Sequence, residues 1–187
     1  MAKKILRQTL REEIQEFQRQ RGPEADAAIT RLFLKTQHLM PQSVVAGYIA
    51  LKGEVSGKEL FQSLSSQGHI TCLPVVTARD EAMIFRAYRA GEPTRPGFMG
   101  QQEPLPHQPE LLPDMLVIPM LGFTRQGYRL GYGSGFYDRT LPALRAIKPV
   151  KTVGLAYSIQ ELPEFPVEPH DAPLDVIITE NEVIKVR

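Results

Sequence analysis

The pattern of apolar and polar residues first predicts two helices at the start of the chain. Between residues 3 and 20, apolar side chains recur at helical spacing, at Leu6, Leu10, Ile14 and Phe17. Gly22-Pro23 interrupts this pattern, and a proline suits the first turn of a second helix. The apolar stripe of that second helix consists of Ala25, Ala28, Ile29, Leu32 and Phe33. We therefore expect a helix, a break at Pro23 and another helix.

Shorter apolar runs predict strands along the rest of the chain. They cover residues 44–51, 70–76, 83–88, 115–118, 152–156, 174–179 and 183–186. Between the first two runs, Ser56 and Glu59 have the spacing of a capping box, which predicts that a helix starts there. Its apolar positions are Leu60, Phe61 and Leu64.

The order of these elements predicts an α/β fold. A strand, a helix and a second strand between residues 44 and 76 indicate a right-handed parallel crossover. Pro74 indicates that the second strand lies near an edge of the sheet or ends early. A later helix is expected to start within a glycine-rich segment and to run to about Ile147. We predict that residues 1–187 form a single three-layer α/β/α domain with a mostly parallel central sheet.

Loops at the ends of these strands are candidates for a binding site. In parallel sheets, ligands bind beyond the carboxyl ends of the strands. Glu54 and the glycine-rich segment each follow a predicted strand, and Asp171 lies in the loop of residues 162–173 before the last two. Residues 91–113 contain six prolines in a stretch too long for a simple connection, so we expect them to form a wall or lid.

Composition narrows the class of protein. The chain has 187 residues, of which 42% are apolar and 23% charged, and a formal net charge of +1. This balance argues against a nucleic-acid-binding protein, which normally carries a basic excess. Cys72 is the only cysteine, so no intrachain disulfide forms and a cytoplasmic location is expected. No apolar run reaches the length of a membrane span or resembles a signal core, so no membrane partner is expected.

Residues 129–139, which read Arg-Leu-Gly-Tyr-Gly-Ser-Gly-Phe-Tyr-Asp-Arg, are the most informative segment. Its three alternating glycines let successive N–H groups point into one concavity, which is a good receptor for phosphate oxygens. Arg129 and Arg139 can complement negative charge, and Asp138 can hold a hard cation such as Mg²⁺. The segment therefore has the groups that a metal-bound polyphosphate needs.

The spacing of the segment matches neither of two common phosphate-binding motifs. In the dinucleotide fingerprint a third glycine would stand where Phe136 stands. Gly122 and Gly127 have the spacing of a P-loop, but Tyr128 and Arg129 occupy the positions of its Lys and Ser or Thr. From the residues alone, the segment is either a phosphate cradle of another type or a tight turn.

Other polar residues have a simple structural explanation as well. The stripe of Lys3, Lys4, Arg7 and Arg11 is typical of a solvated helix face, and Glu54 of a solvated loop acid. His170 and Asp171 are adjacent in a proline-rich loop, where such residues often stabilise turns. Cys72 lies in an apolar strand, which favours packing over reactivity.

Residues 118–123 and 127–139 together resemble the signature of the 5-formyltetrahydrofolate cyclo-ligases, also called 5,10-methenyltetrahydrofolate synthetases. The basic opening of residues 3–7 and the strand before Glu54 are similar to other segments of that family. The loop with His170 and Asp171 fits as well, so the resemblance covers nearly the whole chain in order. It implies an ATP- and Mg²⁺-dependent cyclisation of 5-formyltetrahydrofolate to 5,10-methenyltetrahydrofolate, with release of ADP and phosphate.

The resemblance also implies roles for individual residues. The residues that would contact ATP are Lys3, Lys4 and Arg7 and the loop of Arg129, Leu130, Gly131, Tyr132, Gly133, Ser134, Gly135, Phe136 and Tyr137. The residues that would contact the folate are Ile49, Glu54, Tyr132 and Phe136. Arg129 and Glu54 would take part in catalysis, and Asp138 and Asp171 would bind Mg²⁺. Arg11 receives no role and stays a surface charge.

The chain departs from the family pattern at three positions. Thr124 replaces a frequent Asp, Ser134 a frequent Gly or Lys, and Phe136 a frequent Tyr. The last two changes could alter the affinity for folate or ATP.

Two other functions remain open: a folate- or nucleotide-binding relative without turnover, and a different ATP-dependent small-molecule kinase. We expect a monomer or a weak homodimer.

Overall fold

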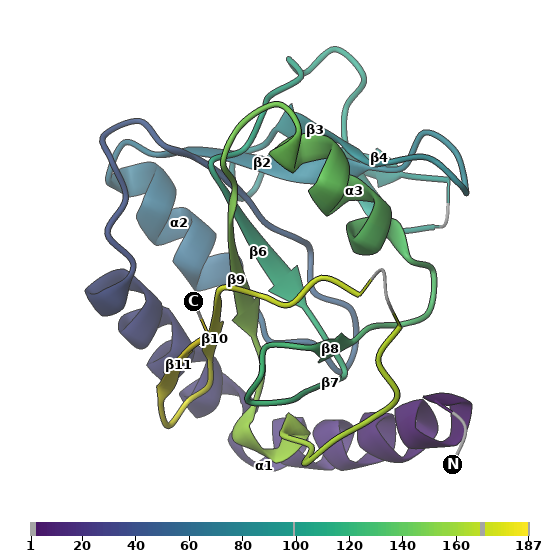
Figure 1. Cartoon of the computed structure of the whole chain (residues 1–187). Helices are drawn as coiled ribbons and strands as arrows, with labels where there is room; N and C mark the ends of the chain where they lie inside the picture. The colour runs from purple at the N-terminus through teal and green to yellow at the C-terminus, as the bar shows by residue number, and fades with distance from the viewer. Residues whose placement is uncertain (1–2, 99, 169–170, 187) are drawn as a thin grey trace.

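A seven-stranded sheet organises the computed structural model, which describes residues 3–98, 100–168 and 171–186 (Figure 1). The strand order is β11-β10-β9-β6-β1-β2-β3. The strands span Val44–Ala46 (β1), Ile70–Val75 (β2), Ile84–Ala87 (β3), Met115–Pro119 (β6), Lys151–Leu155 (β9), Val176–Ile178 (β10) and Val183–Lys185 (β11). The five inner strands are parallel, and β3 and β11 pair antiparallel at the two edges. The prediction of a mostly parallel sheet is confirmed.

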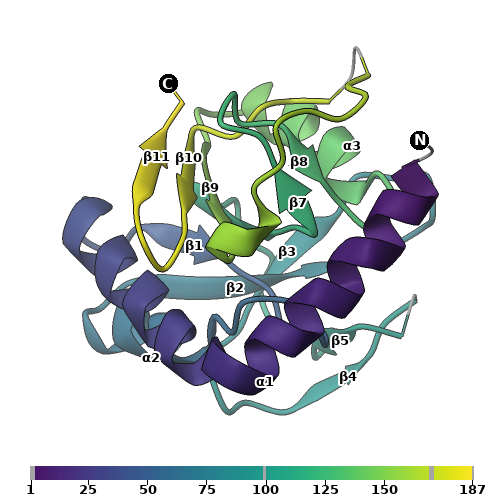
Figure 2. The ribbon, with the colours of Figure 1, turned by 90° about the horizontal axis from the view of Figure 1, so that it is seen from below.

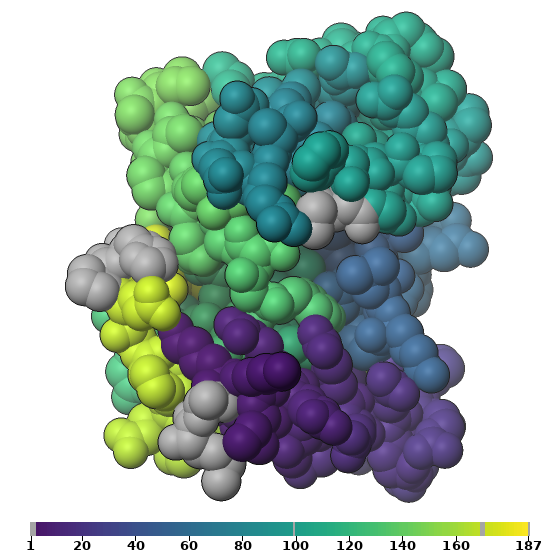
Figure 3. Space-filling view, turned by 90° about the vertical axis from the view of Figure 1, so that its right-hand side faces the viewer, coloured from purple at the N-terminus to yellow at the C-terminus, as the bar shows by residue number. Residues whose placement is uncertain are grey.

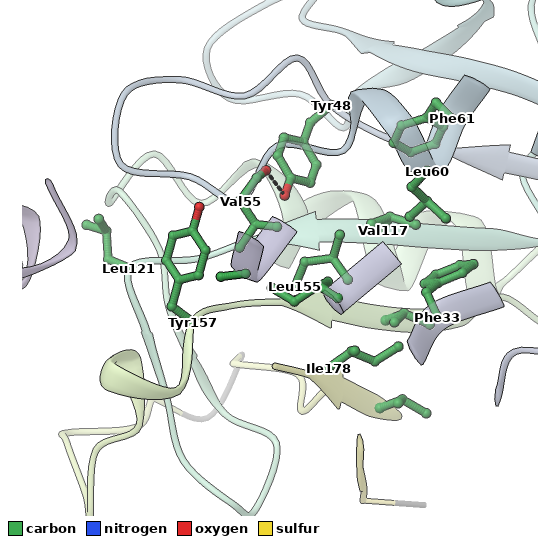
Figure 4. Packing of buried hydrophobic residues seen from close by; sticks show 14 of the residues in the cluster. Phe33, Tyr48, Val55, Leu60, Phe61, Val117, Leu121, Leu155, Tyr157 and Ile178 are labelled. Carbon is green, nitrogen blue, oxygen red and sulfur yellow. Dashed lines mark hydrogen bonds between the residues drawn. The ribbon is translucent and has the colours of Figure 1, made fainter. Parts of the chain in front are cut away.

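Helices cover both faces of this sheet. They span Lys3–Thr36 (α1), Lys58–Ser66 (α2) and Phe136–Arg145 (α3), with a 3-10 turn at Ser158–Gln160 (η1). Alternate residues of β6 separate the two layers: Val117 is buried with the residues of α1 and α2, and Ile118 with those of α3. Figure 4 shows the first of these clusters, in which Phe33, Leu60 and Val117 lie close together. The predicted three-layer arrangement is therefore present.

Helix α1 is continuous, so the predicted break at Pro23 is wrong. The helix contains 34 residues with Pro23 inside it, and Figure 2 shows that it changes direction partway along. A proline inside a helix removes one hydrogen bond and bends the axis. Ile14 before the proline and Phe33 after it are both fully buried in the same cluster. Packing of both halves on one core outweighs the local cost of the proline.

Strand β1 is shorter than predicted, because the chain leaves the sheet after Ala46. Gly47 still donates its N–H to the Cys72 carbonyl at 2.9 Å. A Cβ at Gly47 would lie 1.8 Å from the Phe61 ring, so only glycine lets the backbone pass this close to α2. The departure from the sheet frees the following residues to form the turn that carries Glu54.

The predicted capping box at Ser56 is not formed. Gly57 is the N-cap of α2, and no side chain bonds to the free N–H groups of that helix end. The Ser56 N–H instead donates to Asp26 of α1 at 3.2 Å. A tertiary contact therefore replaces the local cap that the sequence pattern indicated.

Two hairpins were not foreseen within the described part of the chain. The first pairs β4 (Thr94–Pro96) with β5 (Gln102–Pro104) inside the proline-rich segment. The second pairs β7 (Gly122–Phe123) with β8 (Arg129–Leu130) just before the glycines. Strands of two or three residues are too short to give a periodic apolar pattern.

Pro74 and Cys72 both lie on β2. This strand is next to the edge strand β3, as Pro74 predicted, and β1 ends opposite Cys72, so Pro74 has no β1 residue opposite it. Cys72 is buried, and burial raises the pKa of its thiol to about 12.

None of the described helices is both long and apolar enough to cross a membrane.

Candidate functional site

A cavity of about 680 Å³ lies at the ends of the parallel strands. Figure 3 shows this side of the molecule, with the green surface of the glycine-rich segment between the purple start of α1 and the teal region above it. The cavity brings together Lys3, Arg7, Ile49, Glu54, residues 129–138 and Asp171. Lys4 is exposed and does not line it. His170 lies outside the described residues.

Glu54 is held in the turn that follows β1. Its side chain is buried, and Oε2 accepts a hydrogen bond from the Leu51 N–H at 2.8 Å. Its own N–H donates back to the Leu51 carbonyl at 3.0 Å, and Gly53 adopts a φ of +95° that closes the turn. Burial raises the pKa of Glu54, while the Leu51 N–H lowers it. The site therefore presents a desolvated hydrogen-bond acceptor.

Tyr132 adds a buried hydroxyl beside Glu54. Burial and the Glu54 carboxylate raise the pKa of Tyr132, and the Tyr132 hydroxyl in turn lowers the pKa of Glu54. The two side chains therefore present a polar pair to the cavity. Arg11, predicted to be a surface charge only, places its guanidinium 5.5 Å from the centroid of the Tyr132 ring.

The three glycines form a curved backbone next to α1. Gly133 and Gly135 adopt left-handed conformations with φ of +101° and +67°. Arg7 donates from Nε to the Gly131 carbonyl at 2.8 Å, and its guanidinium would lie 3.4 Å from a Cβ at Gly133. Gly135 is the N-cap of α3, whose first turn has free N–H groups and a positive dipole end. This combination suits phosphate oxygens.

Arg129 and Asp138 form an ion pair at the base of this loop. Only 6% of the Arg129 side chain is exposed, and Nη1 also donates to the Ala172 carbonyl at 2.9 Å. Arg129 therefore joins the start of α3 to the proline-rich loop before β10. Arg139, which the sequence suggested as a second anion ligand, does not line the cavity and donates to the backbone carbonyls of Arg79 and Ser134.

Asp171 lies across the cavity near the start of α1. Its carboxylate accepts from the Glu168 N–H at 2.8 Å and lies 3.7 Å from the Lys3 ammonium, which also bonds Glu168 at 3.0 Å. The described residues contain no group of three His, Cys, Asp or Glu side chains that could enclose a metal. Mg²⁺ commonly takes only one or two carboxylates together with phosphate oxygens and water. Asp138 and Asp171 both line the cavity, as a Mg²⁺ site shared with a polyphosphate requires.

The sequence did not indicate the apolar wall opposite the glycines. Leu73, Pro74, Val76 and Met83 line the cavity beside Gln101 and Gln102 of the β4–β5 hairpin. Buried Glu103 holds that hairpin in place by accepting from the Val76 N–H at 2.8 Å and from Gln101 at 2.7 Å. The proline-rich segment, which was expected to form a wall or lid, contributes Gly100, Gln101 and Gln102 to the lining.

Comparison with known proteins settles the family. The model of the 5-formyltetrahydrofolate cyclo-ligase family matches residues 1–180. The chain belongs to this family. Because the family consists of ligases, the chain is an enzyme of that class.

The relatives match over most of the chain. It is 34% identical over 161 residues to the 5-formyltetrahydrofolate cyclo-ligase of Haemophilus influenzae, covering 83% of this chain and 86% of that protein. For the Escherichia coli K12 cyclo-ligase the identity is 30% over 184 residues, covering 96% and 98%.

Two solved structures show the same fold. The NMR structure of Aquifex aeolicus 5,10-methenyltetrahydrofolate synthetase has a TM-score of 0.83 at 26% identity and covers 100% of this chain and 94% of that chain. The synthetase structure from Mycoplasma pneumoniae has a TM-score of 0.76 at 25% identity, covering 96% and 99%.

The three departures from the cyclo-ligase pattern lie in different surroundings. Thr124 is buried outside the cavity in the turn between β7 and β8. Ser134 is exposed at the cavity rim, and Phe136 lines the cavity with the Arg139 guanidinium 5.1 Å from its ring centroid. Only the changes at Ser134 and Phe136 are therefore placed to affect a ligand.

Proposed function

We propose that the chain catalyses the ATP- and Mg²⁺-dependent cyclisation of 5-formyltetrahydrofolate to 5,10-methenyltetrahydrofolate, with release of ADP and phosphate. The observation that carries this proposal is the single cavity shared by Glu54, the glycine-rich loop, the start of α1 and Asp171. These segments are far apart in the sequence, and a tight turn alone would not require them to meet.

The folate is assigned to the part of the cavity around Glu54 and Tyr132. A pterin is a flat ring with N–H donors along its edges, and a buried carboxylate is a suitable acceptor for them. Glu54 accepts a hydrogen bond from the pterin or from the reacting nitrogen, and the buried Tyr132 hydroxyl beside it offers a second polar contact. Ile49, Phe136 and Met83 supply apolar surface for the ring faces.

The triphosphate is assigned to the start of α3 and α1. Lys3 and Arg7 provide positive charge, and the backbone of the glycine-rich loop provides N–H donors. Asp138 and Asp171 would hold Mg²⁺ together with phosphate oxygens. MgATP, when bound, would supply the phosphoryl group that makes the formyl oxygen, otherwise a poor leaving group, able to leave as phosphate.

The chain itself then has mainly to position the folate. N10 attacks the activated formyl carbon within the same molecule, the oxygen leaves with the phosphate, and N10 loses its proton as the new C–N bond forms. Reactions within one molecule reach effective molarities of roughly 10⁵–10⁸ M when the groups are aligned. The turn of Glu54 and the wall of the β4–β5 hairpin restrain the folate, and Arg129 stabilises the charge that moves during phosphoryl transfer.

The direct test is to mix the protein with MgATP and 5-formyltetrahydrofolate and to follow the absorbance of methenyltetrahydrofolate. We expect product to appear only when all three are present. Tight binding of ATP with no product would reject the proposal in favour of a binding protein without turnover.

Asp138→Asn tests the assignment of the metal site. We expect turnover to be abolished with the fold retained, because the amide is a poor ligand for Mg²⁺. Circular dichroism checks the fold, since the change also removes the ionic partner of Arg129. Asp80→Asn, at an exposed carboxylate outside the cavity, is the matched control. Near-normal activity of Asp138→Asn at low Mg²⁺ would remove Asp138 from the metal site.

A further inference from the structure

Gln18 of α1 contacts the Glu54 turn through both ends of its side-chain amide. Oε1 accepts a hydrogen bond from the Gly53 N–H at 3.1 Å, and Nε2 donates to the Glu54 carbonyl at 2.8 Å. Gln18 does not line the cavity, so it cannot contact a ligand there. It bonds the backbone of the turn that carries Glu54.

The other end of this turn is fixed by Asp26. Its Oδ1 accepts from the Ser56 N–H at 3.2 Å and from the Tyr157 hydroxyl at 2.8 Å. Tyr157 is fully buried, and its hydroxyl also accepts from Gln18 Nε2 at 3.2 Å. Figure 4 shows Tyr157 beside Val55, next to this turn. The three side chains therefore form one connected network behind residues 53–56.

The bend of α1 lies between the two contact points. Gln18 precedes Pro23 and Asp26 follows it, yet both side chains reach the same short turn. Residues eight positions apart on a helix are separated by about 12 Å along its axis and by only about 80° around it, so they share one side of the helix. One helix can therefore hold both ends of the turn.

We infer that Gln18 is a positioning residue for Glu54: its amide fixes the backbone of residues 53–54 and so sets where the buried carboxylate lies in the cavity. The functional part of this inference rests on the proposed role of Glu54. Within the turn, Glu54 bonds to Leu51, and Tyr48 and Asp26 hold Val55 and Ser56 after it, so the Gly53 end is the part that needs a separate restraint. Gln18 supplies that external restraint on the side facing Gly53.

Gln18→Met tests the inference, because methionine keeps the length of the side chain and removes both hydrogen-bonding groups. The first measurement is hydrogen exchange of the Gly53 and Leu51 amides in the protein without ligand. We expect exchange at least roughly tenfold faster than in wild type, since two hydrogen bonds that restrain the turn are lost. Gln20→Met is the matched control, because Gln20 is exposed on the same helix and bonds only Glu16.

The second measurement is steady-state kinetics with 5-formyltetrahydrofolate. We expect kcat to fall roughly tenfold, because a displacement of about 1 Å at a reacting centre costs up to about 10²-fold. The KM for ATP should stay within about twofold of wild type, because the phosphate-binding loop is not touched. A general loss of packing would change both constants and the melting temperature together.

A second variant separates the two hydrogen bonds. Gln18→Glu keeps an acceptor for the Gly53 N–H but places a carboxylate against the Glu54 carbonyl, so we expect kcat to be as low as in Gln18→Met. Unchanged exchange at Gly53 in Gln18→Met, or a kcat equal to that of Gln20→Met, would overturn the inference. If wild type forms no methenyltetrahydrofolate, the proposed function is rejected, and the exchange measurement alone decides whether Gln18 restrains the turn.

Discussion

The chemical properties of single residues in this site depend on their burial more than on their residue type. Glu54 looked like an ordinary loop acid in the sequence, but only 5% of it is exposed. Tyr132, Tyr48 and Tyr137 are all close enough for the Glu54 carboxylate to raise their pKa values. A carboxylate in such surroundings is costly to ionise, which makes it a strong acceptor when it is charged.

Glu54→Gln should therefore separate function from stability. In the folded chain the pKa of Glu54 is raised, so its favourable contribution is present below its ordinary value and is lost as the pH rises through the folded value. At pH 7 the neutral amide removes this cost, and we expect a melting temperature equal to wild type or higher by roughly 1–4 °C. The difference should vanish near pH 4, while turnover at pH 7 falls by roughly 10²–10³.

Thermal unfolding at pH 7 and pH 4, together with the absorbance assay, checks both parts of this prediction. Glu13→Gln, at an exposed position of α1, controls for the loss of one negative charge. A variant that is clearly less stable than wild type at pH 7 would show that ionised Glu54 stabilises the fold, contrary to its burial.

Elements were predictable where local pattern decides them. The apolar positions of α1 and α2 and the apolar runs of the sheet strands were sufficient, because these residues pack against other apolar side chains without needing one particular partner. The continuity of α1 through Pro23 and the cap at Gly57 depend on contacts with distant segments. The spacing of residues in the sequence does not show such contacts, so the predicted break at Pro23 and the predicted capping box at Ser56 were both wrong.

The candidate site was predictable for a different reason. The glycines and their charged neighbours form a contiguous signature, so the loop, Arg129 and Asp138 could be named in advance. The ion pair between these two residues was not predicted. The contact between Arg11 and Tyr132 could not be predicted, because the two residues are more than a hundred positions apart. The restraint by Gln18 could not be predicted either, because Gln18 lies about thirty-five positions from Gly53.

Two glycine substitutions distinguish the roles of neighbouring positions in the loop. Gly133→Ala should destabilise the protein by about 1–2 kcal/mol, because φ is +101° there, which corresponds to a fall in melting temperature of roughly 2–8 °C. Gly131→Ala should leave the melting temperature unchanged, because a Cβ there meets no atom within 4 Å. Its methyl group should nevertheless weaken ATP binding if phosphates approach that backbone.

Thermal unfolding and calorimetric titration with MgATP measure these two effects independently. Equal ATP affinity in Gly131→Ala and wild type would argue that the phosphates bind elsewhere. Equal stability in Gly133→Ala would contradict the strain that we expect from its backbone conformation.

At the scale of the whole molecule, the cavity joins parts of the chain that are remote in sequence. Lys3 near one end meets Glu168 and Asp171 near the other, and the glycine-rich loop lines the same cavity. A ligand that contacts all of these segments would be bound by the folded state only. Its binding free energy would therefore add to the free energy of unfolding.

MgATP at about 100 times its dissociation constant should raise the melting temperature by roughly 5–10 °C, since such binding contributes about 2.7 kcal/mol. Lys3→Ala should reduce this shift while changing the ligand-free melting temperature little, because exposed ion pairs contribute about 0–1 kcal/mol. Lys35→Ala, in the last turn of α1, is the control for loss of one positive charge. An identical MgATP shift in both variants would exclude Lys3 from the phosphate site.

The single buried thiol has a practical consequence. Because Cys72 remains protonated inside β2 at neutral pH, maleimides and similar reagents should leave the folded chain unlabelled. A cysteine introduced at an exposed position of the β4–β5 hairpin would then be the sole target for a fluorophore or spin label. Motion of that hairpin over the cavity becomes measurable without first removing a native cysteine.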